Sequence, residues 1–175
     1  MKKLLTVVCM LTFLISGCSD DVNKKESTHP RSELEKSIAN SLIENFGHRH
    51  EFPEDAVEVL EFDETTGKMK VIALTYIYED DIYADFKAEI LSSCASVLQD
   101  IKRQSEVTEV DFIVAVPALD EDGNQMKNLE GNPIDNMTIF NMVFERKNLK
   151  NINFNELDPL KLSKKANFYF EALIE

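Results

Sequence analysis

Apolar residues recur along much of the chain at the spacing of a helix, and elsewhere they alternate with polar residues as in a strand. A first helical pattern follows Ser32 and ends at Gly47. Ser32 and Glu35 have the spacing of a capping box, in which each side chain bonds the backbone N–H of the other residue. We therefore predict a helix that begins just after Ser32 and turns an apolar face toward a core.

A second helical pattern is the strongest in the chain. Asp80 or Asp81 can cap it, and apolar residues then recur every three or four positions: Ile82, Phe86, Ile90, Leu91, Cys94, Val97, Leu98 and Ile101. Because Cys94 lies in the middle of this apolar stripe, we interpret it as a small core residue rather than as a nucleophile.

Four segments have the composition of strands. Residues 57–62 and 68–78 predict a hairpin with a turn between them, and residues 137–146 predict a fourth strand. Residues 110–119 are nearly all apolar, which indicates a central strand, although Pro117 predicts an irregular end or an edge position.

The end of the chain predicts a last helix. Asp158 and Pro159 form a cap and a first-turn residue, and the apolar face would carry Leu162, Ala166, Phe170 and Leu173. The predicted order is α-β-β-α-β-β-α. This order is typical of α+β proteins, and it predicts a two-layer sandwich over residues 32–175, with an antiparallel sheet of about four strands packed by the long second helix.

The first residues follow another pattern. Lys2 and Lys3 precede a 12-residue run, Leu4–Ile15, that is apolar except for two threonines. A helix that spans a membrane needs about 20 apolar residues, so the run has the length of a signal-peptide core instead. An ordinary secretory signal and a short anchor helix are the alternatives that the run alone leaves open.

Ile15-Ser16-Gly17-Cys18 resembles the lipobox of bacterial lipoproteins. The resemblance implies that residues 1–17 are a removable signal peptide and that Cys18 carries a lipid. It also implies attachment to the extracytoplasmic face of the cell membrane, or to the outer membrane in a Gram-negative cell, where Ser19 after the Cys is typical. More faintly, Asp122-Gly123-Asn124 and Lys150–Phe154 resemble parts of small uncharacterised lipoproteins, which imply no activity.

Residues 18–31 are interpreted as the lipidated Cys18 followed by a tether. Ser19–Arg31 is polar and charged, and Pro30 lies near its end. With Cys9 removed and Cys18 lipidated, Cys94 would have no partner for an intrachain disulfide.

The formal net charge of the chain is −13, from 32 acidic and 19 basic residues. Loss of Lys2 and Lys3 with the signal peptide would lower it to −15. Such a surface excludes general binding to nucleic acid, which needs clustered basic residues. The 43% of hydrophobic residues is enough to build a core, which excludes wholesale disorder.

Candidate chemistry is sparse. The chain has no G-x-S-x-G, H-E-x-x-H or C-x-x-C motif and no phosphate-binding glycine loop, so we expect no catalytic residues and no cofactor. His48 and His50 are better explained as loop residues than as metal ligands. Asp120, Asp122 and Asn124 are weak calcium candidates, because glycine falls at the wrong position for an EF-hand and a turn explains these residues better.

We therefore predict a membrane-anchored, non-enzymatic binding domain with a protein partner in the cell envelope. The expected contact surfaces are Asp120–Asp135 and Thr75–Tyr83, with Tyr76, Tyr78 and Tyr83 as aromatic anchors. One alternative is a lipid-anchored inhibitor or immunity-type protein that uses its acidic surface. Another is an envelope hydrolase whose site matches no known motif.

Overall fold

The computed structural model describes residues 32–78, 80–120 and 123–172. The predicted signal peptide, the lipidation of Cys18, the tether and Asp122 lie outside these residues. The described chain contains helices α1 (Glu33–Phe46), α2 (Tyr83–Arg103) and α3 (Arg146–Lys150), 3-10 helices η1 (Gly47–Arg49), η2 (Pro53–Ala56) and η3 (Pro159–Lys164), and strands β1 (Val57–Asp63), β2 (Lys68–Leu74), β3 (Glu109–Pro117), β4 (Asn136–Glu145) and β5 (Phe168–Glu171).

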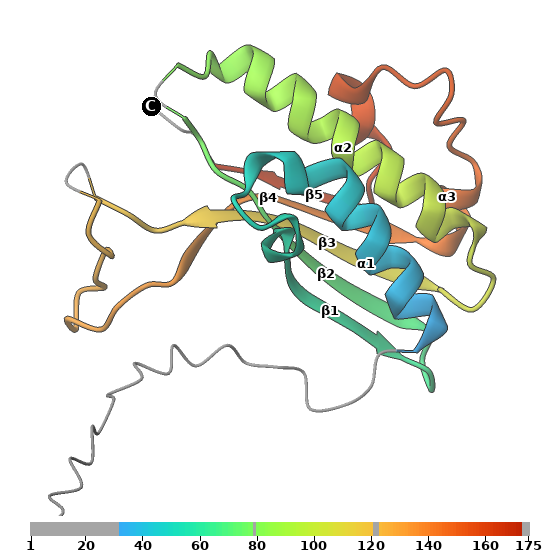
Figure 1. The fold of residues 1–175 in the computed structure, drawn as a ribbon. Helices are drawn as coiled ribbons and strands as arrows, with labels where there is room; N and C mark the ends of the chain where they lie inside the picture. The colour runs from blue at the N-terminus through green and yellow to red at the C-terminus, as the bar shows by residue number, and fades with distance from the viewer. Residues whose placement is uncertain (1–31, 79, 121–122, 173–175) are drawn as a thin grey trace, which may run out of the picture. The chain divides into compact units, whose positions relative to one another are not determined.

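The strands form one sheet in the order β1-β2-β3-β4-β5, and α1 and α2 lie on one of its faces (Figure 1). This arrangement confirms the α+β class. The predicted sheet of about four antiparallel strands is wrong, because the sheet has five strands and β2 pairs with β3 in parallel. The parallel pair arises because α2 carries the chain back to the starting end of the sheet before β3 begins.

The end of the chain also differs from the prediction. Asp158 does act as a cap, accepting a bond from the backbone of Leu160 at 3.1 Å, but the helix it starts is the short η3. Residues 168–171 then form β5, with exposed Phe168 and Phe170 alternating with half-buried Tyr169 and Glu171. Two-residue alternation and aromatic content favour a strand there, so the predicted order with a last helix is wrong.

The two long helices begin in different ways. The capping box of α1 is confirmed, because Ser32 Oγ accepts from the Glu35 N–H at 3.2 Å and a Glu35 carboxylate oxygen accepts from the Ser32 N–H at 2.8 Å. The N-cap of α2 is Ile82, which makes no capping hydrogen bond. The predicted capping by Asp80 or Asp81 is therefore wrong, and the Asp81 carboxylate binds Arg49 instead.

Gly47 ends α1 for a steric reason. Its φ of −62° is open to any residue, so no left-handed conformation calls for glycine here. A Cβ atom at this position would lie 2.8 Å from the Cβ of Pro53, which is too close. Glycine is needed because η2 packs directly against the end of α1.

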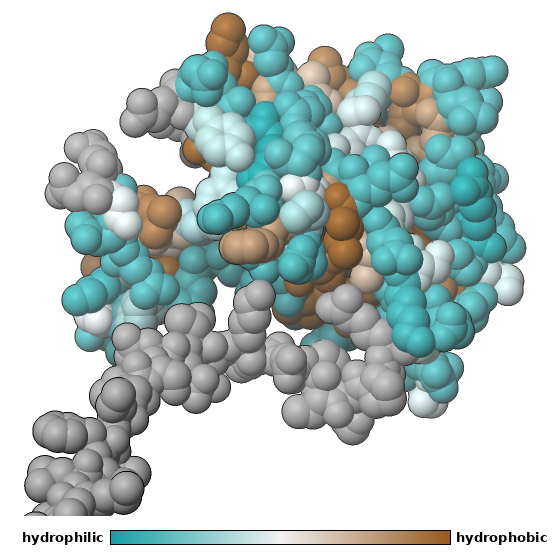
Figure 2. Space-filling view, viewed as in Figure 1, coloured by the Kyte–Doolittle hydropathy of each residue, from teal (hydrophilic) through white to brown (hydrophobic). Residues whose placement is uncertain are grey.

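The face of the molecule drawn in Figure 2 is mainly hydrophilic, with separate brown apolar areas. No helix among the described residues is long and apolar enough to cross a membrane.

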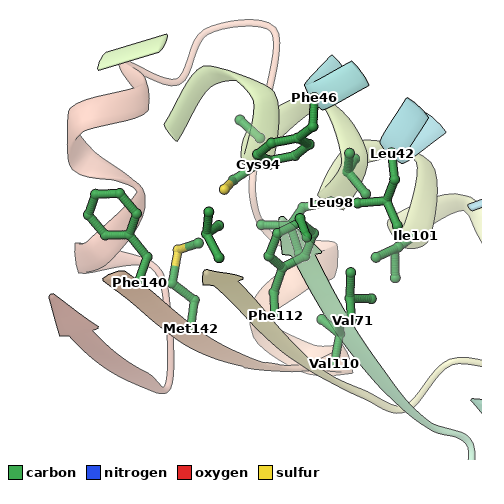
Figure 3. Close-up of a cluster of buried hydrophobic side chains, with 14 of the residues drawn as sticks. Leu42, Phe46, Val71, Cys94, Leu98, Ile101, Val110, Phe112, Phe140 and Met142 are labelled. Carbon is green, nitrogen blue, oxygen red and sulfur yellow. The ribbon is translucent and has the colours of Figure 1, made fainter. Parts of the chain in front are cut away.

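The core fills the space between the helices and the sheet (Figure 3). Phe46 of α1, Leu98 of α2 and Phe112 of β3 meet there, and Phe46 and Phe112 stack at a tilt with 6.4 Å between ring centres. Cys94 is a fully buried free thiol in this layer, which confirms that it is a core residue.

We expect Cys94 to resist alkylation in the folded protein, because burial raises the pKa of its thiol and no reagent can reach it. Iodoacetamide labelling, followed by mass spectrometry across a urea titration, should modify Cys94 only as the protein unfolds. Rapid modification without urea would contradict the packing seen here.

Candidate protein-binding surface at one end of the sheet

The two predicted contact segments leave the sheet at the same end. Leu74 at the end of β2 pairs with Ala115 near the end of β3, and the Thr75 N–H continues this pairing by donating to the Ala115 carbonyl at 2.9 Å. Because β2 and β3 are parallel, the segments that follow them start side by side. We call this the distal end, and define it as residues 48–56, 75–78, 80–85, 117–120 and 123–137.

The chain enters the domain at the opposite end. Ser32 and Leu34 lie beside Phe62, Glu64 and Glu106, which border the β1–β2 turn and the start of β3. The Phe62 N–H also donates to the Glu35 carboxylate at 3.2 Å. The start of α1 and the distal end are therefore separated by the length of the sheet (Figure 1).

Residues 118–120 and 123–135 form an arm that projects beyond β3 and β4 (Figure 1). Two tight hairpins build it, one turning between Asp120 and Asn124 and the other between Asn128 and Asn132. Their paired bonds include Met126 N–H to the Ala118 carbonyl and Ile134 N–H to the Met126 carbonyl, both 2.8 Å. The arm is thus an ordered extension of the sheet.

The two turns have the same construction. In each, the first side chain accepts from the backbone N–H four residues later, at 2.8 Å for Asp120 and 2.9 Å for Asn128. The fourth residue of each is a glycine with positive φ, which is +79° at Gly123 and +83° at Gly131. This pattern is a turn followed by a left-handed residue.

The same construction can be read in the sequence. The pattern Asp/Asn-x-x-Gly-Asn occurs twice, with its two copies starting eight residues apart, and the sequence-based prediction did not include it. Two of the three calcium candidates lie in the first of these turns. Asp120 Oδ1 also accepts a hydrogen bond from Asn124 Nδ2 at 3.3 Å, so both residues build the turn. Asp122 lies outside the described residues. Among the residues that are described, no three His, Cys, Asp or Glu side chains are grouped to hold a metal ion.

Arg49 holds the other part of the distal end in place. Its guanidinium donates to both carboxylate oxygens of Glu89, each at 2.7 Å, and to those of Asp81 at 2.8 and 3.2 Å. The Tyr76 carbonyl takes a further bond at 3.0 Å. These contacts satisfy all the donors that a guanidinium has.

Arg49 is also enclosed by aromatic rings. Its guanidinium carbon lies 5.4 Å from the ring centre of Tyr78 and 5.0 Å from that of Phe86. Only 7% of its side chain is exposed, although it is charged. Hydrogen bonding from Arg49 lowers the pKa of Glu89 to about 2 and lowers that of Asp81 as well. We call Arg49 and these partners the Arg49 cage; it holds Tyr76 and Asp81 beside Glu89 of α2.

The neighbouring histidines do not converge. His48 Nε2 contacts the Glu89 carboxylate at 2.8 Å, whereas His50 Nε2 contacts the Leu74 carbonyl at 2.8 Å. His48 therefore contacts α2 and His50 contacts the end of β2, so the two rings do not share one site.

Tyr83 is not part of an exposed surface, in contrast to the sequence prediction. Its hydroxyl donates to the Glu171 carboxylate at 2.6 Å, which also receives bonds from Lys87 at 2.5 Å and Tyr169 at 2.8 Å. Burial and the bond to Glu171 raise the pKa of Tyr83 to about 12. This cluster attaches β5 to α2.

Exposed apolar side chains gather at the distal end. Of the twelve large ones that the described residues expose, nine lie there: Phe52, Tyr76, Ile77, Tyr78, Ile82, Leu119, Met126, Leu129 and Met137. Leu129 at the tip of the arm is fully exposed, at 109% of its reference area. Such a concentration at one end is typical of a surface that contacts a partner.

Acidic side chains border this apolar surface. The described distal end exposes seven acidic side chains and one lysine. These are Glu51, Glu54, Asp80, Asp85, Asp120, Glu130 and Asp135, together with Lys127. The distal end therefore combines apolar contacts with a negative potential.

Comparison with protein-family models, curated proteins and solved structures finds no match to this chain. The fold and the surface together define an α+β domain with an exposed apolar surface bordered by acids.

Proposed function

We propose that the protein is a membrane-anchored bacterial lipoprotein whose α+β domain binds a protein partner on the extracytoplasmic side, without catalysing a reaction. The lipid on Cys18 would hold it at the cell membrane, or at the outer membrane of a Gram-negative cell. The observation that carries the binding role is the concentration of exposed apolar side chains at the distal end.

The position of Ser32 supports this orientation. A domain held through the start of α1 presents the opposite end of its sheet to the surroundings, and that end carries the arm. The predicted tether, Ser19–Arg31, would span about 20 Å as a random coil, which is enough to separate the domain from a bilayer.

The anchor is tested by replacing Cys18 with serine. We expect the parent protein in the membrane fraction with a lipid mass on Cys18, and Cys18→Ser in the soluble fraction, because the lipid would be the attachment. Cys94→Ala is the matched control and should remain in the membrane fraction. A free Cys18 thiol in the mature protein would rule out lipid anchoring.

The binding surface is tested at the tip of the arm. Cross-linking on intact cells should enrich a partner with the parent protein and at least fivefold less with Leu129→Ser, because the variant removes a fully exposed apolar contact. Leu160→Ser is the control, since Leu160 is exposed outside the distal end. Equal capture by both variants would exclude the arm as the contact surface.

The acidic border of the distal end favours a second candidate function. A lipid-anchored inhibitor or immunity-type protein would use this potential to capture a basic enzyme or incoming factor. In that case the rate at which the protein associates with its basic partner should fall at least tenfold between low and physiological salt. A rate that is independent of salt would remove this candidate and leave the binding role.

A further inference from the structure

The face of the sheet away from α1 and α2 is not covered by any described element (Figure 1). One row of side chains crosses all five strands on this face, in register: Val59, Ile72, Ile113, Asn141 and Phe170. None of the five is fully buried, and Phe170 is 46% exposed. Four apolar residues therefore form a partly exposed line that is interrupted by one amide.

The adjacent row is mixed. It consists of Glu61, Lys70, Asp111, Val143 and Phe168, again in register across the sheet. Its second aromatic residue, Phe168, is 51% exposed beside Phe170 on the edge strand. The apolar line is thus widest at β5 and borders charged residues toward β1.

Two polar atoms on this face lack partners. Asp111 Oδ1 and Asn141 Oδ1 are both buried, and neither accepts a hydrogen bond from any described residue. Burial raises the pKa of the Asp111 carboxyl, with Lys70 opposing the shift and Glu109 adding to it. An acceptor that is buried without a donor is unfavourable in the isolated protein, so a side-chain rotation that brings either oxygen to a donor of a partner would be favourable.

We propose that this face binds a basic amphipathic segment of a partner, with the apolar side of the segment along the Val59–Phe170 row and an arginine or lysine donating to Asp111. Five strands at their usual spacing place about 19 Å between the ends of the row, which a helix of about 13 residues would cover. The inference concerns a different surface from the distal end and does not depend on it.

Charge favours such a segment over a second copy of this chain. The face carries Glu61, Asp63, Glu109, Asp111 and Glu145 against Lys68 and Lys70, and Lys68 is already paired with Glu109 at 3.0 Å. Two copies packed face to face would bring like charges and unpaired acceptors together. A basic segment supplies both the opposite charge and the donors.

The composition of residues 18–31 disfavours them as the occupant. Their apolar content, besides Cys18, is a single valine, Val22, which could not cover four apolar positions. A segment with leucines at helical spacing could cover them, because such spacing lines one side of a helix with apolar side chains.

The probe is a fluorescein-labelled peptide of 18 residues with leucines at helical spacing and arginines beside them, compared with a peptide in which glutamates replace the arginines. Binding to the full purified chain is measured by fluorescence anisotropy in dodecyl maltoside at low salt. We expect micromolar binding of the arginine peptide, and binding at least tenfold weaker for the glutamate peptide.

Two variants test the assignment of the face. Asp111→Asn and Phe170→Ser should each weaken binding at least fivefold, whereas Glu44→Gln, which removes a charge from exposed α1 surface, should not change it. The melting temperature of Asp111→Asn should equal or exceed that of the parent, because the variant removes a partly buried charge whose Oδ1 atom accepts no hydrogen bond from a described residue. If Asp111→Asn is as stable as the parent but binds the peptide more weakly, the loss of binding is due to lost recognition and not to unfolding.

Other outcomes would overturn the proposal. These are equal affinity for both peptides, unchanged binding by Asp111→Asn and Phe170→Ser, or a dimer in sedimentation velocity that Phe170→Ser dissociates. Leu129→Ser should leave peptide binding unchanged, and a loss of binding in that variant would assign the peptide to the distal end instead.

Discussion

Replacing Arg49 with alanine is expected to lower the free energy of unfolding by about 3 kcal/mol, as measured by urea denaturation. The substitution removes every bond of a buried guanidinium and leaves Asp81 and Glu89 without their cation. Asp81 is the more costly to leave unpaired, because only 16% of its side chain is exposed, against 39% for Glu89.

Two further substitutions calibrate this result. Arg49→Lys keeps the charge but cannot reach two carboxylates and a carbonyl with planar geometry, so we expect about half of the full loss. Arg103→Ala removes an exposed pair with Asp100 and should change stability by less than about 1 kcal/mol. Equal effects of Arg49→Ala and Arg103→Ala would contradict the structural role of the Arg49 cage.

The pH dependence should identify the same groups. Arg49, together with His48, lowers the pKa of Glu89 from 4.5 to about 2 in the folded protein, and Arg49 lowers that of Asp81 too. The stabilisation is therefore complete above pH 4.5 and is lost as the pH falls toward 2. Arg49→Ala should flatten this loss in urea titrations repeated between pH 7 and pH 2.5.

Replacing Gly67 with alanine is expected to lower the free energy of unfolding by about 3 kcal/mol, through strain and a steric clash together. The φ of Gly67 is +71°, which disfavours any L side chain. A Cβ atom would lie 2.6 Å from the Glu106 carbonyl oxygen and 2.8 Å from Thr108 Cγ2. The Thr108 N–H bonds the Gly67 carbonyl at 2.8 Å, so the loop cannot retreat without breaking this contact.

Gly131→Ala separates the two causes. Gly131 has a similar φ of +83°, but no atom lies within 4 Å of an added Cβ. Its substitution should therefore cost only the conformational strain, about 1 kcal/mol. Thermal denaturation of both variants gives the comparison, and equal losses would show that the contact with residues 106–108 has no effect.

Local signals predicted the parts of the fold that depend on neighbouring residues. The capping box of α1, the first hairpin and the apolar stripe of α2 each rest on contacts within one element or one turn. The parallel pairing of β2 with β3 was not predictable in this way. The 21-residue helix α2 lies between the two strands, and no short sequence pattern indicates whether strands so far apart pair in parallel or antiparallel. β5, with four residues, is too short for alternation to outweigh a helical pattern.

The candidate surface shows the same division. Residues 75–83 and 120–135 were each predicted as contact segments, whereas the position of their described residues at one end of the sheet follows from the parallel pair. Asp81 was taken for a helix cap because its true partner, Arg49, lies 32 positions earlier in the chain. The repeat in the arm, by contrast, was present as a local pattern and could have been found by comparing the two glycine turns.

The repeated turn divides the arm into two separate hairpins that meet at Met126. Each eight-residue unit closes its own hairpin through its first side chain and its glycine, and the register of β3 with β4 is complete without it. Insertion or loss of one unit would therefore add or remove one hairpin of the arm while leaving the sheet intact.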